Sequence, residues 1–292
     1  MDRIELDSFA KVNLTLEVGA KRPDGYHEID SVVSVIDIRD RLSIEKAEPG
    51  LIEVDVEGDA PQGRDNLIYR ACEAFLRETE ISGGARFGLE KRIPMQAGLG
   101  GGSGNAAAAI VGLDRLYETQ LPQDELCALA ASVGSDAGLF VHGGTVRMHG
   151  RGEQVEPLPD APCLDLVVVM PGFGVSTAWA YEELDRAPSR KWLGASDRAE
   201  SAIRQGDREA LIESLWNDFD RLVRAFEGMR MARWLLNGAR TMLCGSGSAL
   251  FGVFDSPESA KGVAGEMMRS YRIVFATRML SRAESSGEQS LQ

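Results

Sequence analysis

Residues 94–107 read PMQAGLGGGSGNAA, and this stretch decides the fold. Five glycines fall within the eight positions 98–105, and apolar residues at helical spacing follow them, so the stretch predicts a glycine-rich loop that leads directly into a helix. Glycine leaves the backbone N–H groups of such a loop unshielded, and the N-terminus of a helix attracts anions. A plain connection would avoid the conformational entropy that five glycines cost. We therefore expect this loop to bind phosphate.

Two other glycine motifs fit this loop poorly. A P-loop of the Walker type ends in Gly-Lys followed by Ser or Thr, and this stretch has no such ending. Residues 102–107 match the relaxed pattern of dinucleotide-binding loops, but they lie a third of the way along the chain, behind Lys91 and Arg92, and not in an opening strand–helix–strand unit. A Rossmann dehydrogenase that binds NAD is therefore the weakest alternative.

Strand and helix patterns flank the loop on both sides. Apolar residues alternate over 12–18 up to a Pro-Asp-Gly turn, and a second apolar run at 32–38 is the expected partner strand. Asp65 and Asn66 are candidate caps of a helix near 68–76, and a short strand at Phe87 and Leu89 precedes the loop. Further along, we expect strands at 163–170, 249–254 and 273–277 and helices at 178–184, 207–219, 229–237 and 256–268. This order predicts an α+β fold.

Composition limits the classes of function. The chain has 292 residues, 43% of them hydrophobic, which is enough for one large domain or two ordinary ones, and no long apolar run indicates a signal peptide or a membrane span. The formal net charge of −13 disfavours binding to nucleic acid or to an anionic membrane. Four cysteines are too widely spaced for a disulfide framework or a paired metal motif, so we expect buried thiols in a cytoplasmic protein: Cys72, Cys127, Cys163 and Cys244.

Three motifs in order resemble the GHMP kinase superfamily, which includes galactokinase, homoserine kinase, mevalonate kinase and phosphomevalonate kinase. They are Phe-Ala-Lys-Val-Asn-Leu at 9–14, the glycine-rich loop, and Leu-Cys-Gly-Ser-Gly-Ser-Ala at 243–249. The resemblance implies an ATP-dependent kinase for small molecules. It also implies a two-domain α+β fold with a left-handed βαβ element, a ferredoxin-like second domain and an active site in the inter-domain cleft. We place the domains at 1–155 and 156–283, followed by a polar tail at 284–292 without a role.

Four further segments resemble one branch of this superfamily, whose acceptor is a cytidine diphosphate conjugate. They are Arg-Pro-Asp-Gly-Tyr-His at 22–27, Asp-Asn-Leu-Ile at 65–68, Gly-Ser-Asp at 134–136, and Gly-Gly-Thr at 143–145 leading to Gly-Arg-Gly-Glu at 150–153. Three positions depart from the usual pattern: Ala137 and Gly138 replace the usual Val-Pro, and Cys244 replaces the usual serine. We expect these departures to affect the fine geometry beside Asp136 more than the reaction.

The resemblance assigns the chemistry to Lys11 and Asp136. Taken alone, an aspartate that follows glycine and serine is more often a turn residue or a helix cap. Matched to the family, Asp136 is the base that accepts the proton of the attacking hydroxyl, and Lys11 is the cation that favours its ionised form. Strand alternation places Lys11 and Asn13 on the face that carries Phe9, so we expect both to point into one cleft.

The resemblance also implies which residues bind the two substrates. For ATP, with Arg92 as a weaker second cation, they are Asn66, Lys91, Pro94, Gly98, Leu99, Gly100, Gly101, Gly102, Ser103, Gly104 and Asn105. For the cytidine conjugate they are Asn13, Tyr26, His27, Asp136, Thr177 and Tyr181, three of which (Tyr26, His27 and Tyr181) surround the cytosine. Mg²⁺ is expected because ATP carries it, and Ser103 is a candidate contact for phosphate or Mg²⁺. His142 and His149 show no ligand spacing, so we predict no metal site built from protein ligands.

Two alternatives remain open from the sequence. Another member of the superfamily, such as a homoserine or mevalonate kinase, would keep the loop but would not need Tyr26 and His27. A non-catalytic metabolite sensor built on the same fold would lose Lys11 or Asp136, and both residues are present. The sequence does not specify an oligomeric state.

Overall fold

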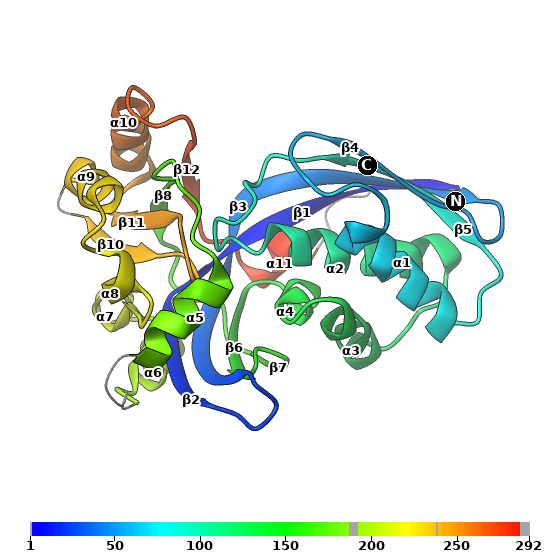
Figure 1. The fold of residues 1–292 in the computed structure, drawn as a ribbon, viewed down its shortest axis with the longest axis horizontal. Helices are drawn as coiled ribbons and strands as arrows, with labels where there is room; N and C mark the ends of the chain where they lie inside the picture. The colour runs from blue at the N-terminus through cyan, green and yellow to red at the C-terminus, as the bar shows by residue number, and fades with distance from the viewer. Residues whose placement is uncertain (1, 187–191, 238, 287–292) are drawn as a thin grey trace.

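Two β-sheets form the framework of the molecule (Figure 1). The structure is a computed structural model that describes residues 2–186, 192–237 and 239–286. The larger sheet contains β1 (Arg3–Asn13), β2 (Thr15–Lys21), β3 (His27–Ala47), β4 (Ile52–Glu57), β5 (Gly84–Glu90), β6 (Thr145–Gly150), β7 (Gln154–Pro157) and β9 (Trp216–Asn217). Strand β3 organises this sheet, because it pairs antiparallel with β1, β2, β5 and β6.

The strand predicted at 12–18 is in fact two strands. β1 pairs with β3 up to Asn13, the strand is interrupted at Leu14, and β2 starts at Thr15. Leu14 is fully buried, and its N–H donates to Val32 O at 2.8 Å, so the break does not interrupt the apolar face. The alternation of apolar residues therefore gave the correct face but hid the change of strand.

Four helices cover one face of the larger sheet: α1 (Leu67–Glu78), α2 (Gly101–Tyr117), α3 (Gln123–Val133) and α4 (Ala137–His142) (Figure 1). A short 3-10 helix, η1 (Gly63–Asp65), precedes α1. The predicted cap of α1 is confirmed, because the Asn66 side chain accepts a hydrogen bond from Ile68 N at 2.9 Å. Helix α1 connects the parallel pair β4 and β5, and α2 packs against β1 and β3.

The smaller sheet has four antiparallel strands in the order β10 (Arg240–Leu243), β11 (Leu250–Phe254), β8 (Asp165–Val169), β12 (Val274–Arg278). Helices lie between β8 and β10 and between β11 and β12 in the chain, so the connection is strand–helix–strand–strand–helix–strand, the ferredoxin-like arrangement. The remaining helices are α5 (Thr177–Arg186), α6 (Ala195–Gln205), α7 (Arg208–Ser214), α8 (Asp220–Val223), α9 (Glu227–Leu235), α10 (Pro257–Met267) and α11 (Arg282–Ser285).

The two sheets share one apolar cluster. Val12 and Ile36 of the larger sheet pack in the same buried group as Leu166 and Phe251 of the smaller one. Burial of such a cluster is the main favourable term in folding, so this cluster fixes the sheets, and the loops at their junction, relative to one another. Within the described ranges, no helix is long and apolar enough to cross a membrane.

Three expectations need correction. The helix expected over 207–219 ends at Ser214, because the next residues form β9 and pair with β2. Cys163 is exposed and Cys127 is only half-buried, whereas Cys72 and Cys244 are buried as expected. The segment assigned to the polar tail begins with ordered residues, since Glu284 belongs to the capping box of α11. Residues 287–292 of that segment lie outside the described residues.

Candidate active site

The glycine-rich loop forms the N-terminus of α2. Gly98 and Gly100 have φ of +77° and +72°, a left-handed conformation that favours glycine, and Gly100 is the residue immediately before the helix. Leu99 O accepts a hydrogen bond from Lys11 N at 2.9 Å, which attaches the loop to β1. The first N–H groups of α2 have no partner within the helix, and the helix dipole adds positive potential there. The local structure is therefore suited to bind phosphate.

A cavity of about 280 Å³ lies between this loop and the start of α1. The residues predicted for ATP, apart from Gly104 and Arg92, line it: Asn66, Lys91, Pro94, Gly98, Leu99, Gly100, Gly101, Gly102, Ser103 and Asn105. Asn66 is nearly buried, and its amide is committed to Ile68 N and to Pro61 O, so it shapes the wall of the cavity. The structure thus brings the predicted ATP residues together around one space.

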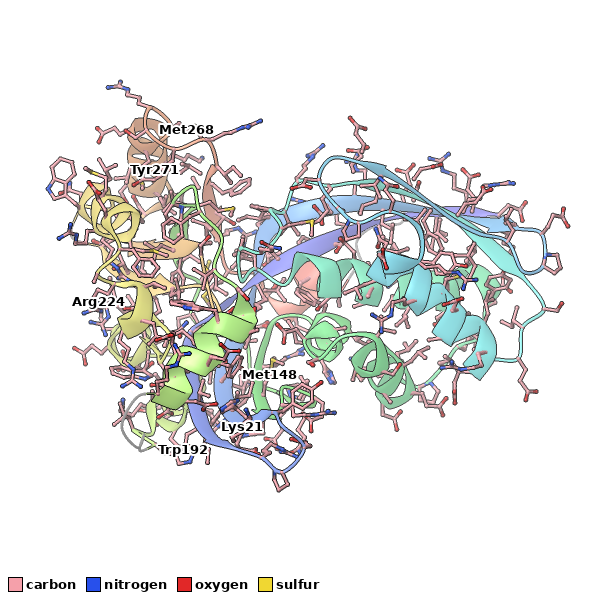
Figure 2. All side chains as sticks on the ribbon, viewed as in Figure 1. Lys21, Met148, Trp192, Arg224, Met268 and Tyr271 are labelled. Atoms are coloured by element: carbon pink, nitrogen blue, oxygen red, sulfur yellow. The ribbon has the colours of Figure 1, made fainter. Side chains whose placement is uncertain are left out.

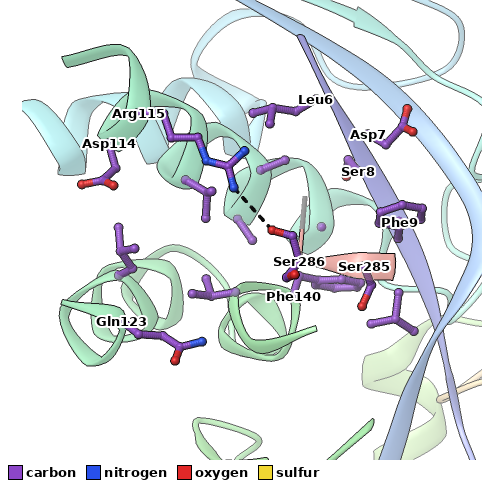
Figure 3. A pocket seen from close by; sticks show the side chains of 17 residues that line it. Leu6, Asp7, Ser8, Phe9, Asp114, Arg115, Gln123, Phe140, Ser285 and Ser286 are labelled. Carbon is purple, nitrogen blue, oxygen red and sulfur yellow. Dashed lines mark hydrogen bonds between the residues drawn. The ribbon is translucent and has the colours of Figure 1, made fainter. Parts of the chain in front are cut away.

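Gly104 lies on the opposite side of α2. A Cβ at this position would come within 2.7 Å of Phe9 O, so glycine is needed there for α2 to approach β1. Gly104 lines a separate cavity of about 360 Å³, which Figure 3 shows from close by. Arg115 Nη2 donates to Ser286 O across this cavity at 3.4 Å. Gly104 is therefore required for the packing of α2 on β1, and its contact with ATP stays a prediction.

Asp40 is a buried residue beside the loop that sequence reasoning missed. Its carboxylate has no exposed surface and accepts hydrogen bonds from Lys91 Nζ at 2.5 Å, Arg92 N at 2.7 Å, Ile93 N at 2.8 Å and Asn105 Nδ2 at 2.8 Å. These contacts join β3 to residues 91–93, which precede the glycine-rich loop, and to Asn105 in the first turns of α2. The sequence signal is an aspartate inside a strand whose neighbours, Ile38 and Leu42, are buried.

Lys91 is tied to Asp40 as well as lining the cavity. Its side chain is 4% exposed, and burial lowers the pKa of its ammonium group, although the Asp40 carboxylate acts in the opposite direction. Arg92 is exposed and pairs with Glu90 at 3.2 Å. Lys91, the cation predicted for ATP, therefore also neutralises the buried Asp40 carboxylate that holds the loop.

Lys11 and Asp136 face each other beside the loop. The distance from Lys11 Nζ to Asp136 Oδ2 is 3.4 Å, and the Lys11 side chain is 5% exposed while that of Asp136 is 37% exposed. Asp136 immediately precedes α4, but its side chain makes no capping hydrogen bond. The turn or cap interpretation thus does not account for the orientation of this carboxylate, whereas its contact with a buried lysine does.

A chain of hydrogen bonds orients Lys11. Its ammonium group donates to Asn13 Oδ1 at 2.7 Å, and Asn13 Nδ2 donates to Ser31 Oγ at 2.8 Å. Ser31 Oγ in turn donates to Thr15 O at 2.5 Å. The prediction that Lys11 and Asn13 share one face is confirmed by their direct contact, and substrate binding by Asn13 stays a prediction.

The third motif packs directly on the glycine-rich loop. A Cβ at Gly98 would lie 1.9 Å from Cys244 O, and Ala249 N donates to Ala97 O at 3.1 Å. Asn217, which sequence reasoning missed, donates to Leu243 O and Gly245 O and so holds this segment from β9. Burial raises the pKa of the Cys244 thiol to about 12, so cysteine serves here as a neutral, small buried side chain.

The predicted base-binding residues lie where α5 meets the β2–β3 hairpin. The rings of His27 and Tyr181 stack, with centroids 4.9 Å apart and planes inclined by 26°. Tyr181 also packs edge-on against Phe219, with centroids 4.9 Å apart. Tyr26 is 55% exposed, with the Arg151 guanidinium 4.9 Å from its ring centre.

Thr177 begins α5, and its hydroxyl lies 2.9 Å from Ser246 Oγ of the third motif. Helix α5 therefore connects the aromatic group at the hairpin with the third motif, which packs on the glycine-rich loop. A lysine–aspartate pair beside a helix N-terminus that is suited to phosphate is the arrangement expected of one class of protein, the small-molecule phosphotransferases.

Known proteins agree with this class. A family model described as the GHMP kinases N terminal domain matches residues 66–144. The 4-diphosphocytidyl-2-C-methyl-D-erythritol kinase of Moorella thermoacetica is 40% identical over 288 residues, which cover 96% of this chain and 100% of that protein. A crystal structure of 4-(cytidine 5'-diphospho)-2C-methyl-D-erythritol kinase is 32% identical and has a TM-score of 0.74, with 94% of this chain and 99% of that chain covered. The chain belongs to the 4-diphosphocytidyl-2-C-methyl-D-erythritol kinase family and is a kinase.

The fold alone does not select this family. The crystal structure of homoserine kinase from Cytophaga hutchinsonii has a TM-score of 0.75 and covers 96% of this chain and 95% of that chain, but it is only 16% identical. The two solved structures are thus equally similar in shape and differ in sequence identity. The family assignment therefore depends on residues and not on topology.

Proposed function

We propose that this kinase transfers the γ-phosphoryl group of ATP to the 2-hydroxyl of 4-diphosphocytidyl-2-C-methyl-D-erythritol, a step of the methylerythritol phosphate route to isoprenoid precursors. The observation that carries the proposal is the contact of Lys11 Nζ with Asp136 Oδ2 at 3.4 Å, directly beside the helix N-terminus that is suited to phosphate. A transferase of this kind needs its base and its phosphate site within reach of one hydroxyl group. The cytoplasmic location remains a prediction.

In the proposed reaction, the oxygen of the 2-hydroxyl group attacks the γ-phosphorus, and Asp136 accepts the proton of that hydroxyl group. The bond between that phosphorus and the β–γ bridging oxygen breaks, and ADP leaves. Lys11 stabilises the ionised carboxylate and the negative charge that develops on the attacking oxygen. The N–H groups at the start of α2, around Gly101 and Gly102, hold the phosphates in place.

Mg²⁺ enters with ATP in this proposal and supplies neutralisation of charge on the phosphate oxygens. Within the described ranges, no group of three or more His, Cys, Asp or Glu side chains is close enough to hold a metal ion. Mg²⁺ commonly keeps several waters and binds through phosphate oxygens with few protein ligands. Ser103, which lines the cavity at the loop, is the proposed protein contact for phosphate or Mg²⁺.

We assign base recognition to Tyr26, His27 and Tyr181, with Thr177 nearby. A mevalonate or homoserine acceptor carries no base, so the stacked ring pair of His27 and Tyr181 supports the cytidine conjugate over those acceptors. The contact of Lys11 with Asp136 supports a catalyst over a sensor that only binds metabolites.

The test is steady-state measurement of ADP formation with ATP and four acceptors: the cytidine conjugate, mevalonate, homoserine and galactose. We expect the highest kcat/KM with the cytidine conjugate. A higher kcat/KM with any of the other three would assign the chain to a different reaction of the superfamily. The absence of ADP formation with all four acceptors, in a protein that binds ATP, would support the sensor.

A further inference from the structure

Asp185 holds His27 from the helix that also carries Tyr181. His27 is the first residue of β3, its side chain is 5% exposed, and its Nε2 lies 2.7 Å from Asp185 Oδ1. Tyr181 and Asp185 are four residues apart in α5, so they lie on the same face of the helix, one turn from each other. Tyr181 stacks on the imidazole ring of His27, and Asp185 binds the edge of that ring.

Asp185 also contacts the neighbouring strand. Its Oδ2 lies 3.8 Å from the Nζ of Lys21, the last residue of β2, which Figure 2 labels. The carboxylate therefore connects α5 to both strands of the β2–β3 hairpin. Its side chain is 34% exposed, so the position is open enough to accept a change to asparagine without disturbing a packed core.

The contact with Asp185 determines which ring nitrogen of His27 carries the proton. An ionised carboxylate can only accept hydrogen bonds, so the short contact requires a proton on Nε2. In a neutral imidazole the other nitrogen, Nδ1, then carries a lone pair and is an acceptor. Among the residues that the structure describes, none makes a hydrogen bond with Nδ1.

We propose that Asp185 is a specificity-determining positioning residue, which holds His27 as the Nε2–H tautomer so that Nδ1 can accept a hydrogen bond from the 4-amino group of cytosine. Uracil carries a carbonyl oxygen at that position, and two acceptors facing each other leave both unpaired. The inference rests on the proposed function, because it concerns how the cytidine acceptor is distinguished from its uridine analogue. It adds a residue that touches neither the base nor the reacting atoms.

The first test measures the tautomer in the free protein. The ¹⁵N chemical shifts of the imidazole nitrogens distinguish Nε2–H from Nδ1–H, and the chain has only three histidines, so a His27→Ala variant assigns the signals. We expect Nε2–H for His27 in the wild type. In Asp185→Asn the side-chain amide can donate to Nε2, so we expect the Nδ1–H tautomer to become populated. A wild-type ring protonated on Nδ1 alone would overturn the proposal, whatever the variants do.

The second test measures kcat/KM with the cytidine and the uridine conjugates. We expect Asp185→Asn to lower the ratio of cytidine to uridine efficiency by about tenfold, the equivalent of one neutral hydrogen bond, while KM for ATP stays unchanged. Glu182→Gln is the matched control, because it makes the same chemical change on an exposed position of the same helix, and its ratio should equal that of the wild type.

The outcomes separate this inference from the proposed function. If the wild type does not phosphorylate the cytidine conjugate, both fail. If the wild type prefers the cytidine conjugate and Asp185→Asn keeps the wild-type ratio, only the role of Asp185 is overturned. A variant that loses activity equally with both conjugates also overturns that role, because a merely structural effect would not depend on the base.

Discussion

Replacing Asp40 by asparagine tests whether the position of the glycine-rich loop depends on a buried ion pair. The Asp40 carboxylate has no exposed surface, and it is the ion-pair partner of Lys91, whose side chain is 4% exposed. Asparagine keeps the size and one acceptor oxygen for Arg92 N and Ile93 N. Its amide hydrogens, however, would face the donors of Lys91 and Asn105.

The magnitude follows from the charge left without a partner. Breaking a buried ion pair by removing one partner costs about 3–5 kcal/mol. Burial already lowers the pKa of Lys91, so in the variant the amine can lose its proton rather than stay buried as a cation, and the lower end of that range applies, about 3 kcal/mol. We also expect a higher KM for ATP, because the contacts that position the loop weaken.

The dependence on pH has a definite sign. In Asp40→Asn the folded-state pKa of Lys91 falls further below its unfolded value, so the unfolded state binds more protons than the folded state between these two values. The stability of the variant therefore rises with pH through that window and falls as the pH is lowered. The difference from the wild type is expected to shrink towards alkaline pH.

Urea unfolding at several pH values measures this effect. Glu90→Gln is the matched control, because it removes the charge of an exposed pair with Arg92 on the same segment, where about 0–1 kcal/mol is expected. The double variant Asp40→Asn with Lys91→Met removes both charges and should recover most of the loss. Equal stability of Asp40→Asn and Glu90→Gln at neutral pH would refute the reasoning.

Three further changes test the other parts of the site. Gly102→Val adds a side chain at the cavity where a Cβ meets only Leu67 Cδ1 at 3.4 Å, so the protein should fold while ATP binding by calorimetry weakens about tenfold or more; unchanged affinity would remove the loop from phosphate binding. Asp136→Asn should lower kcat by about 10²- to 10⁴-fold with ATP affinity retained, and a nearly normal kcat would leave the residue a structural role. Tyr181→Ala should raise the acceptor KM roughly 5- to 150-fold, with Tyr181→Phe as the conservative control, and an unaltered KM would argue against stacking on the base.

Local patterns predicted the elements that depend on local chemistry. The caps and apolar spacing of α1, the glycine loop before α2 and the strands around Val167 and Phe251 were all visible in the sequence, because caps, periodicity and glycine act over a few residues. The helix expected through Trp216 was wrong for the opposite reason. There a pairing between β9 and β2, some two hundred residues apart in the chain, overrides the helical spacing.

The candidate site divides in the same way. The motifs indicated Lys11 and Asp136 through family resemblance, and the structure then placed them in contact. Asp40, Asp185 and Asn217 were missed, because each acts through a partner far away in the sequence and none lies in a motif. The glycine motif alone does not distinguish Gly101 from Gly102 as a position for a test substitution. A Cβ at Gly101 would come within 2.8 Å of Ile93, so Gly102 is the better position for testing the loop.

The central claim is transfer of phosphate to the cytidine conjugate by Lys11 and Asp136, and ³¹P NMR of the reaction tests it most directly. The wild type with ATP and the cytidine conjugate should give one new phosphomonoester signal, assigned to the oxygen on C2, together with an equal amount of ADP. Under the same conditions Asp136→Asn should give almost no product, and methylerythritol without the nucleotide should react far more slowly. Efficient phosphorylation of the free alcohol, a phosphate on another oxygen, or undiminished transfer by Asp136→Asn would contradict the account.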